Sequence, residues 1–160
     1  AYCMEQATDR CKMYCGEKNQ MYSALSEELA RMYNAAGRRE ESLACHLAVR
    51  NQLLKNGYRE GSLLLMVDNN MSVVYLDLGK PEEAIPYLTE ALELTKENGL
   101  VGSAVAEPTW NLARVYRALG DEEKEDIYLK AAVEGFRECY PPEHPKRIAA
   151  EQRLKERQGE

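Results

Sequence analysis

Residues 81–94 read Pro-Glu-Glu-Ala-Ile-Pro-Tyr-Leu-Thr-Glu-Ala-Leu-Glu-Leu, and this stretch decides the fold. Its apolar residues recur every three or four positions, at Ala84, Ile85, Leu88, Ala91, Leu92 and Leu94, which is the period of an amphipathic helix. Pro81 suits the first turn, where a missing N–H costs little, and Glu82 and Glu83 follow at the positive end of the helix dipole. The stretch therefore predicts a helix with one buried face.

Glycines on both sides of this stretch recur with a single period of 41–42 residues. One set closes short turns and is spaced by 42 and 41 residues: Gly37, Gly79 and Gly120. A second set follows long helical runs and is spaced by 41 and 42 residues: Gly16, Gly57 and Gly99. Two independent glycine ladders with one period indicate an internal repeat, and the second set is placed to end helices in the left-handed conformation.

Side chains at constant distances from the turn glycines support the repeat. A tyrosine stands four residues before each turn glycine (Tyr33, Tyr75, Tyr116), a large apolar residue eight before (Leu29, Met71, Leu112) and a small one seven before (Ala30, Ser72, Ala113). Large and small residues at fixed places are what closely crossing helices need, because their ridges must interlock. Nine residues after the turn glycine, His46 takes a core position that Leu88 and Leu129 hold in the other units.

Each unit is predicted to be a pair of antiparallel helices. The first helices are expected over about 18–36, 60–78 and 103–119, and the second over about 38–55, 80–98 and 122–139. The whole is one array over 1–160: 1–16 as the second helix of a preceding repeat, repeats at 17–57, 58–99 and 100–144, and a capping helix at 145–160. About eight helices and no strand are therefore expected, in a chain that we expect to be part of a longer protein.

The Leu/Met-small-x-x-Tyr-x-x-x-Gly pattern, together with residues 81–94, resembles the tetratricopeptide repeat over nearly the whole chain. The unit exceeds the usual length of about 34 residues, and is similar to the arrays of kinesin light chains and of Pins-type polarity adaptors. Glu143-His144-Pro145 favours the first group, and Asn56-Gly57 with Asn98-Gly99 the second. One departure is Glu125, where the family has a small residue, which raises the question of how tightly the third unit packs.

The resemblance implies an α-solenoid, a right-handed superhelix whose concave wall is made by the first helix of each unit. Such a groove accepts an extended or helical peptide, so the expected function is an interaction scaffold or adaptor that binds a segment of a partner protein. The alternative is a regulatory or sensor domain that controls a larger multidomain protein through intramolecular contacts. A third option is self-association through exposed helix ends.

Groove residues follow from the resemblance by their offset from the turn glycine. Asn70 and Asn111 stand where a family Asn hydrogen-bonds the peptide backbone, whereas the first unit has Glu28 there. The neighbouring groove offsets are occupied by Glu27, Asn69, Trp110, Arg31, Val73, Arg114, Asn34, Leu76 and Arg117. Trp110 would be an aromatic anchor or a core residue, and Arg114 and Arg117 would hold partner carboxylates or pair with Glu on a neighbouring helix. The lysines of the chaperone-tail carboxylate clamp are missing, so binding of that tail is not expected.

Composition limits the partners. The chain carries a net charge of −6 with a pI near 5.2, which argues against nucleic acid and anionic membranes. Arg31, Arg114 and Arg117 would add positive charge to the groove, so we expect a protein or peptide partner that carries acidic residues. No apolar run approaches the roughly 18 residues of a membrane span.

Five cysteines without a CxxC pair indicate reduced thiols and an intracellular, reducing compartment, hence a cytoplasmic protein, with the resemblance adding the cytoskeleton. Cys11 and Cys15 share a helix face and could join His46 around a metal, but buried or idle thiols are the favoured interpretation, and no metal or cofactor is expected.

The sequence contains no nucleotide-binding, hydrolase or zinc-protease motif. The side chains of Cys45 and His46 point in different directions because adjacent residues of a helix do not face each other. The chain is predicted not to be an enzyme.

Overall fold

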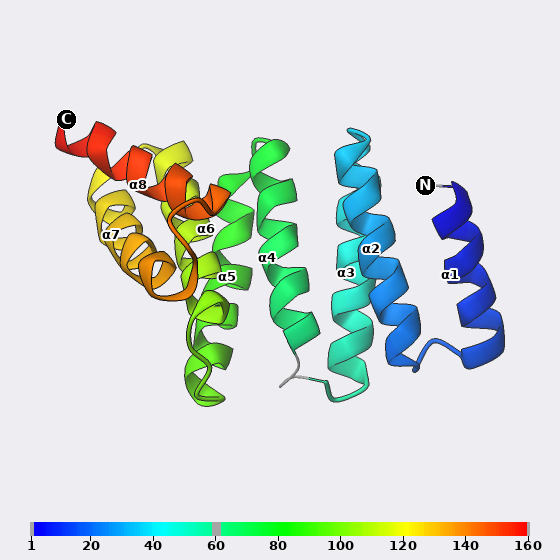
Figure 1. Cartoon of the computed structure of the whole chain (residues 1–160). Coiled ribbons are helices and arrows are strands. Elements are labelled where there is room, and N and C mark those ends of the chain that lie inside the picture. The colour runs from blue at the N-terminus through cyan, green and yellow to red at the C-terminus, as the bar shows by residue number, and fades with distance from the viewer. Residues whose placement is uncertain (1, 59–61, 160) are drawn as a thin grey trace. The chain divides into compact units, whose positions relative to one another are not determined.

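The computed structural model describes residues 2–58 and 62–159. Over these residues the chain forms eight helices and no strand (Figure 1). The helices are α1 (Tyr2–Cys15), α2 (Gln20–Ala35), α3 (Arg39–Lys55), α4 (Ser62–Asp77), α5 (Pro81–Glu97), α6 (Ser103–Leu119), α7 (Glu122–Cys139) and α8 (Pro145–Gln158). The expected all-α fold is confirmed. Positions 60 and 61 of one expected helix, and the end positions 1 and 160, lie outside the described residues.

The chain divides into two compact units, Ala1–Gly79 and Lys80–Glu160. The division falls inside the repeat expected at 58–99, between its two helices. Unit 1 contains α1 to α4, and unit 2 contains α5 to α8.

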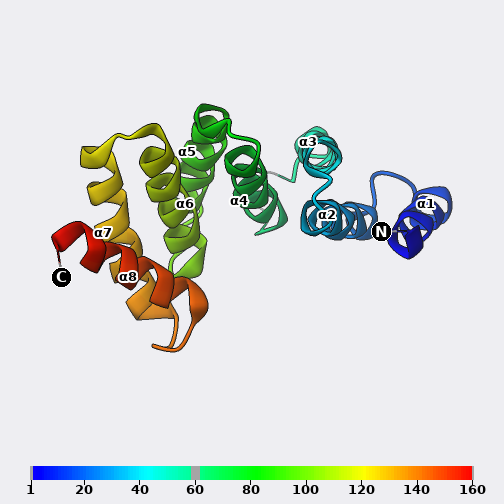
Figure 2. The ribbon, with the colours of Figure 1, turned by 90° about the horizontal axis from the view of Figure 1, so that it is seen from above.

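In unit 1 each helix packs on the next, and α2 also contacts α4 (Figure 2). The large and small residues predicted from the repeat are buried here: Leu29, Ala30, Met71 and Ser72. Val49 and Leu53 of α3 join this core together with Leu64 and Val67 of α4. Ser42, at a place where the family has a small residue, is fully buried and donates a hydrogen bond to the Ala30 carbonyl oxygen at 2.7 Å.

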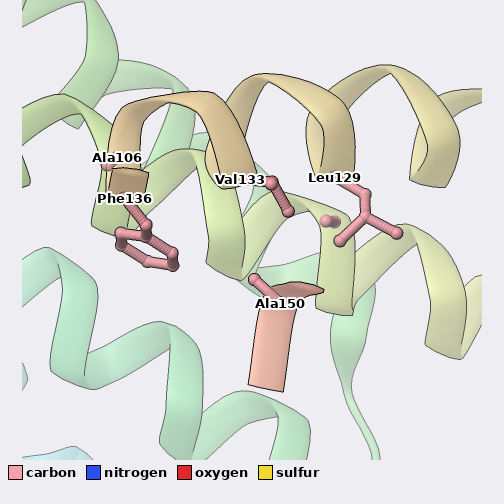
Figure 3. Close-up of a cluster of buried hydrophobic side chains, with 6 residues drawn as sticks. Ala106, Leu129, Val133, Phe136 and Ala150 are labelled. Atoms are coloured by element: carbon pink, nitrogen blue, oxygen red, sulfur yellow. The ribbon is translucent and has the colours of Figure 1, made fainter. Parts of the chain in front are cut away.

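In unit 2 the helices α5 to α8 also pack in chain order. Their core includes a cluster of six buried residues, Ala106, Ala113, Leu129, Val133, Phe136 and Ala150, in which α7 supplies the three largest side chains and α8 supplies Ala150 (Figure 3). Gly135 allows α6 and α7 to pack closely, because a Cβ atom built there would lie 2.9 Å from Ala106 Cβ.

The ends of the helices follow the signals in the sequence. Pro81 begins α5, with Glu82 and Glu83 in its first turn, as predicted. The glycines of both ladders have positive φ values between 61° and 78°: Gly16, Gly37, Gly57, Gly79, Gly99 and Gly120. The left-handed caps predicted at Gly57 and Gly99 are therefore confirmed.

Glu125 does not loosen the third unit. Its side chain is 4% exposed and accepts two hydrogen bonds from Arg153 of α8, at 2.7 Å to Oε1 and 3.1 Å to Oε2. Because a buried carboxylate is tolerated when its acceptors are satisfied, α8 supplies what this position requires.

In the part of the chain that the structure describes, no helix is both long and apolar enough to traverse a membrane.

Candidate functional site

A pocket of about 200 Å³ opens in unit 1 among α2, α3 and α4. Its lining consists of Arg31, Asn34 and Ala35 from α2, His46 from α3, and Asn70 and Val73 from α4. The structure thus brings together Arg31, Asn34 and Asn70, three of the residues that the sequence assigned to the groove. They come from helices that are neighbours in space because the repeat places the first helix of one unit near that of the next.

A buried network of polar side chains lies beside this pocket. Asn70 Nδ2 donates to Glu27 Oε1 at 2.7 Å, and His46 Nδ1 lies 2.7 Å from Glu27 Oε2. The side chains of Glu27 and His46 are each 1% exposed. Both oxygens of a carboxylate that water does not reach are therefore bonded, by residues from two other helices.

At the rim of the pocket, Arg31 Nη1 lies 2.9 Å from Glu28 Oε2, and both side chains are about half exposed. An ion pair of this kind is worth little, about 0–1 kcal/mol, because water screens it. Arg31 could therefore exchange Glu28 for a carboxylate of a partner at small cost.

Asn34 and Asn69 are both half-buried in unit 1. Asn34 lines the pocket, and its Oδ1 atom is buried without a hydrogen-bond partner among the residues described. Asn69 does not line the pocket; its backbone carbonyl accepts a hydrogen bond from Ser72 Oγ at 2.6 Å.

The remaining predicted groove residues lie along α6 in unit 2. Asn111 is buried, at 7% exposure, and its Oδ1 atom accepts a hydrogen bond from Arg114 Nη1 at 3.2 Å. Arg117 is exposed. Trp110 is half-buried against the core cluster, and its ring meets Phe136 edge-on with centroids 6.4 Å apart. This contact is what the core interpretation of Trp110 anticipates, while part of the ring stays accessible to solvent.

Sequence reasoning assigned His46 to the core, and the structure agrees. It did not pair His46 with Glu27, which was considered only as a groove offset. The sequence indicated that His46 has a polar partner, because a histidine at a core position needs one. It did not indicate which residue this is, since the partner lies 19 residues away on another helix.

No group of three or more His, Cys, Asp or Glu residues suited to a metal ion occurs among residues 2–58 and 62–159. Cys11, Cys15 and the other three cysteines are free thiols, and burial is the main cause that raises the pKa of Cys45. A raised pKa leaves a thiol protonated and weakly nucleophilic.

A family model described as Tetratricopeptide repeat matches residues 20–97 and 63–138. No curated protein matches the sequence.

Two groups of solved structures are similar. Nearly identical TPR-like repeats of a Podosopora anserina protein assigned as a kinesin light chain are 22% identical over 98% of this chain and 76% of that chain, with a TM-score of 0.76. A variant of the same repeats gives a TM-score of 0.78 with the same identity and coverage. BtubC (BKLC) from P. vanneervenii is 19% identical over 88% of this chain and 64% of that chain, with a TM-score of 0.72.

Proposed function

We propose, from the premise that this chain belongs to the tetratricopeptide repeat family, that it binds a peptide or helical segment of a partner protein on the helix faces that carry Asn70 in unit 1 and Asn111 in unit 2. The family and the fold support a protein-interaction scaffold in general. The finer proposal concerns the binding face and the chemistry of the partner.

The observation that carries the proposal is the pocket of unit 1. It combines the amides of Asn34 and Asn70, the cation of Arg31 and the apolar side chain of Val73. Amides that carry both a donor and an acceptor suit a polypeptide backbone, and an adjacent apolar surface suits its side chains. Nothing in this lining is a nucleophile with an adjacent base, so binding without chemistry is the function it supports best.

The partner segment is acidic in this proposal. Arg117 is exposed, and no ion-pair partner for it is found within the described ranges. Among the residues described, Arg31 pairs with Glu28, whose carboxylate is exposed. Cations at such positions on a chain of net charge −6 favour a partner that brings carboxylates to them.

The similarity to kinesin light chain repeats supports an adaptor that works in the cytoplasm near the cytoskeleton. Five free thiols suit a reducing compartment of this kind.

A peptide array probed with the purified chain tests the proposal. The double variant Asn70→Ala/Asn111→Ala should abolish binding to the peptides that the wild-type chain captures. The matched control is Asn51→Ala/Gln152→Ala, which removes one exposed side-chain amide from each unit outside the proposed face. Circular dichroism of both variants checks that they remain helical. Equal capture by the two variants would refute the proposed face, and capture of no peptide by the wild-type chain would refute peptide binding.

A further inference from the structure

The buried hydrogen-bond network of Asn70, Glu27 and His46 lies beside the pocket of unit 1. This network orients a side chain that lines the pocket. Glu27 belongs to α2, His46 to α3 and Asn70 to α4, so the three side chains join the three helices that line the pocket. Each of the two bonds of the Glu27 carboxylate is 2.7 Å long. Both distances are at the short end of the range for hydrogen bonds between nitrogen and oxygen.

This network determines the orientation of the Asn70 amide. The NH₂ group of Asn70 is the end that meets Glu27, because Asn70 Nδ2 donates to Glu27 Oε1. The carbonyl oxygen of Asn70, a residue that lines the pocket, is therefore not engaged by Glu27.

A second acceptor lies in the same pocket. Asn34 Oδ1 is buried and has no hydrogen-bond partner in the described part of the chain. A buried acceptor without a donor is unfavourable. The cation that lines the pocket, Arg31, is already opposed by Glu28.

We infer that Glu27 and His46 are positioning residues, which hold the Asn70 amide so that the pocket of unit 1 selects a hydrogen-bond donor, such as a backbone N–H of the partner. This inference deepens the proposed function and rests on it for the identity of the partner as a polypeptide. The positioning itself is a property of the free protein. Glu27 and His46 need not touch the partner.

The positioning is tested by nuclear magnetic resonance of the uniformly ¹⁵N-labelled chain without any ligand. In the wild-type chain, the side-chain NH₂ signals of Asn70 should show one proton shifted downfield and slow exchange with water. Glu27→Leu removes both acceptor oxygens and keeps a side chain of similar size at this position. The signature should therefore be lost in Glu27→Leu, and unchanged Asn70 signals there would overturn the inference.

Substitutions of His46 give a second readout if Glu27→Leu does not fold. His46→Asn retains a donor near the position of Nδ1 and should preserve the Asn70 signature. His46→Leu removes the donor and should weaken it, although leucine fills the core position in the other two units. Loss of the signature in both variants would mean that His46 affects the Asn70 signals through core packing alone, and would overturn the positioning role.

Donor selection is tested with two small probes, N-methylacetamide and N,N-dimethylacetamide, which differ by one N–H group. N-methylacetamide should shift the Asn70 side-chain signals, with an apparent dissociation constant about tenfold lower than that of the dimethyl compound, the change expected for one hydrogen bond. Equal shifts from the two probes would overturn donor selection.

The two levels of failure can be told apart. A chain that captures no peptide on the array but keeps the Asn70 signature and the probe preference contradicts the proposed function and supports the positioning. A chain that captures peptides but shows no preference between the probes contradicts the inference and leaves the proposed function standing.

Discussion

Five residues after the turn glycine, the three repeats carry Ser42, Ala84 and Glu125, and all three are buried. Each side chain is accommodated by a different means. Ser42 donates to a backbone carbonyl of α2, Ala84 has no polar group to satisfy, and Glu125 accepts two hydrogen bonds from Arg153. A charged residue can replace a small one here because a neighbouring helix provides the counter-charge.

Removing that counter-charge should be costly. Arg153→Ala leaves the Glu125 carboxylate buried and unpaired, and we expect a loss of about 3–5 kcal/mol in the free energy of unfolding. Adding Glu125→Ala should restore most of this loss, since alanine is the residue of the middle repeat. Urea denaturation measures both effects.

The control is Arg137→Ala, whose ion pair with Glu151 involves a side chain that is 57% exposed. It should cost about 0–1 kcal/mol. If Arg153→Ala is no more destabilising than this control, the pair with Glu125 contributes little.

Two tyrosines make the stability depend on alkaline pH. The hydroxyl of Tyr33 donates to Glu5 at 2.7 Å, and this bond, with burial, raises the pKa of Tyr33 to about 12. Burial, with a hydrogen bond to Glu107, raises the pKa of Tyr140 to about 12. The pKa of an unfolded tyrosine is about 10. The folded chain therefore holds these protons more tightly, and their contribution to stability is complete below about pH 10 and is lost as the pH rises to about 12.

The double variant Tyr33→Phe/Tyr140→Phe should accordingly lose less stability than the wild-type chain between about pH 9 and about pH 11.5. The urea midpoint at the two pH values gives the measurement. Tyr2→Phe/Tyr14→Phe, which alters two exposed tyrosines, serves as the control and should behave as the wild-type chain. An identical decline in all three proteins would contradict the assignment to Tyr33 and Tyr140.

At this scale the sequence predicted the residues whose environment is set by the repeat and missed those whose environment is set by contacts between helices. His46 was correctly assigned to the core because Leu88 and Leu129 occupy the same offset. The burial of Glu27 was not predicted, because an acidic residue in an acidic chain reads as solvated until both of its partners are seen. The groove roles of Asn70 and Asn111 stay predictions.

The helices themselves were the most predictable level. The expected helix at 103–119 coincides with α6, and the one at 80–98 differs from α5 by one residue at each end. These ends depend on glycine, proline and acidic residues within a turn of the boundary, which are local signals. How closely two helices approach is not local, and the contact at Gly135 was not predicted.

Gly135→Ala should reverse the usual sign of a glycine substitution in a helix. Alanine in place of glycine normally stabilises a helix by about 1 kcal/mol. Here the new Cβ atom would lie 2.9 Å from Ala106 Cβ and 3.6 Å from its Cα, so α6 and α7 must separate. We expect a net loss of about 1–3 kcal/mol, measured by thermal or urea unfolding.

The compensating variant Gly135→Ala/Ala106→Gly moves the methyl group from one helix to the other and tests whether the collision is the cause. It should be more stable than Gly135→Ala alone. Additive losses from the two substitutions would show that the contact between these two residues is not what limits the approach.

For the whole molecule, the period of 41–42 residues predicted an internal repeat, and the residue pattern inside it, together with residues 81–94, predicted the family, which the match over residues 20–97 and 63–138 establishes. The repeat pattern is made by the apolar residues of the core, and scaffolds that bind unrelated partners share this pattern. The choice of partner depends instead on a few polar side chains that the period leaves unconstrained. For this reason the fold could be predicted from the sequence with more detail than the function.

Charge on the proposed face should govern how tightly an acidic peptide binds. Arg117→Glu reverses an exposed charge on α6 and, for the strongest peptide of the array, should weaken binding about three- to tenfold at low salt. Lys130→Glu makes the same change of net charge on the exposed surface of α7, outside the predicted face, and should have little effect. Because salt screens exposed charges, the difference between the two variants should shrink at about 1 M salt, as titration calorimetry would measure. Equal weakening by both variants would mean that net charge alone, and not the face carrying Arg117, attracts the peptide.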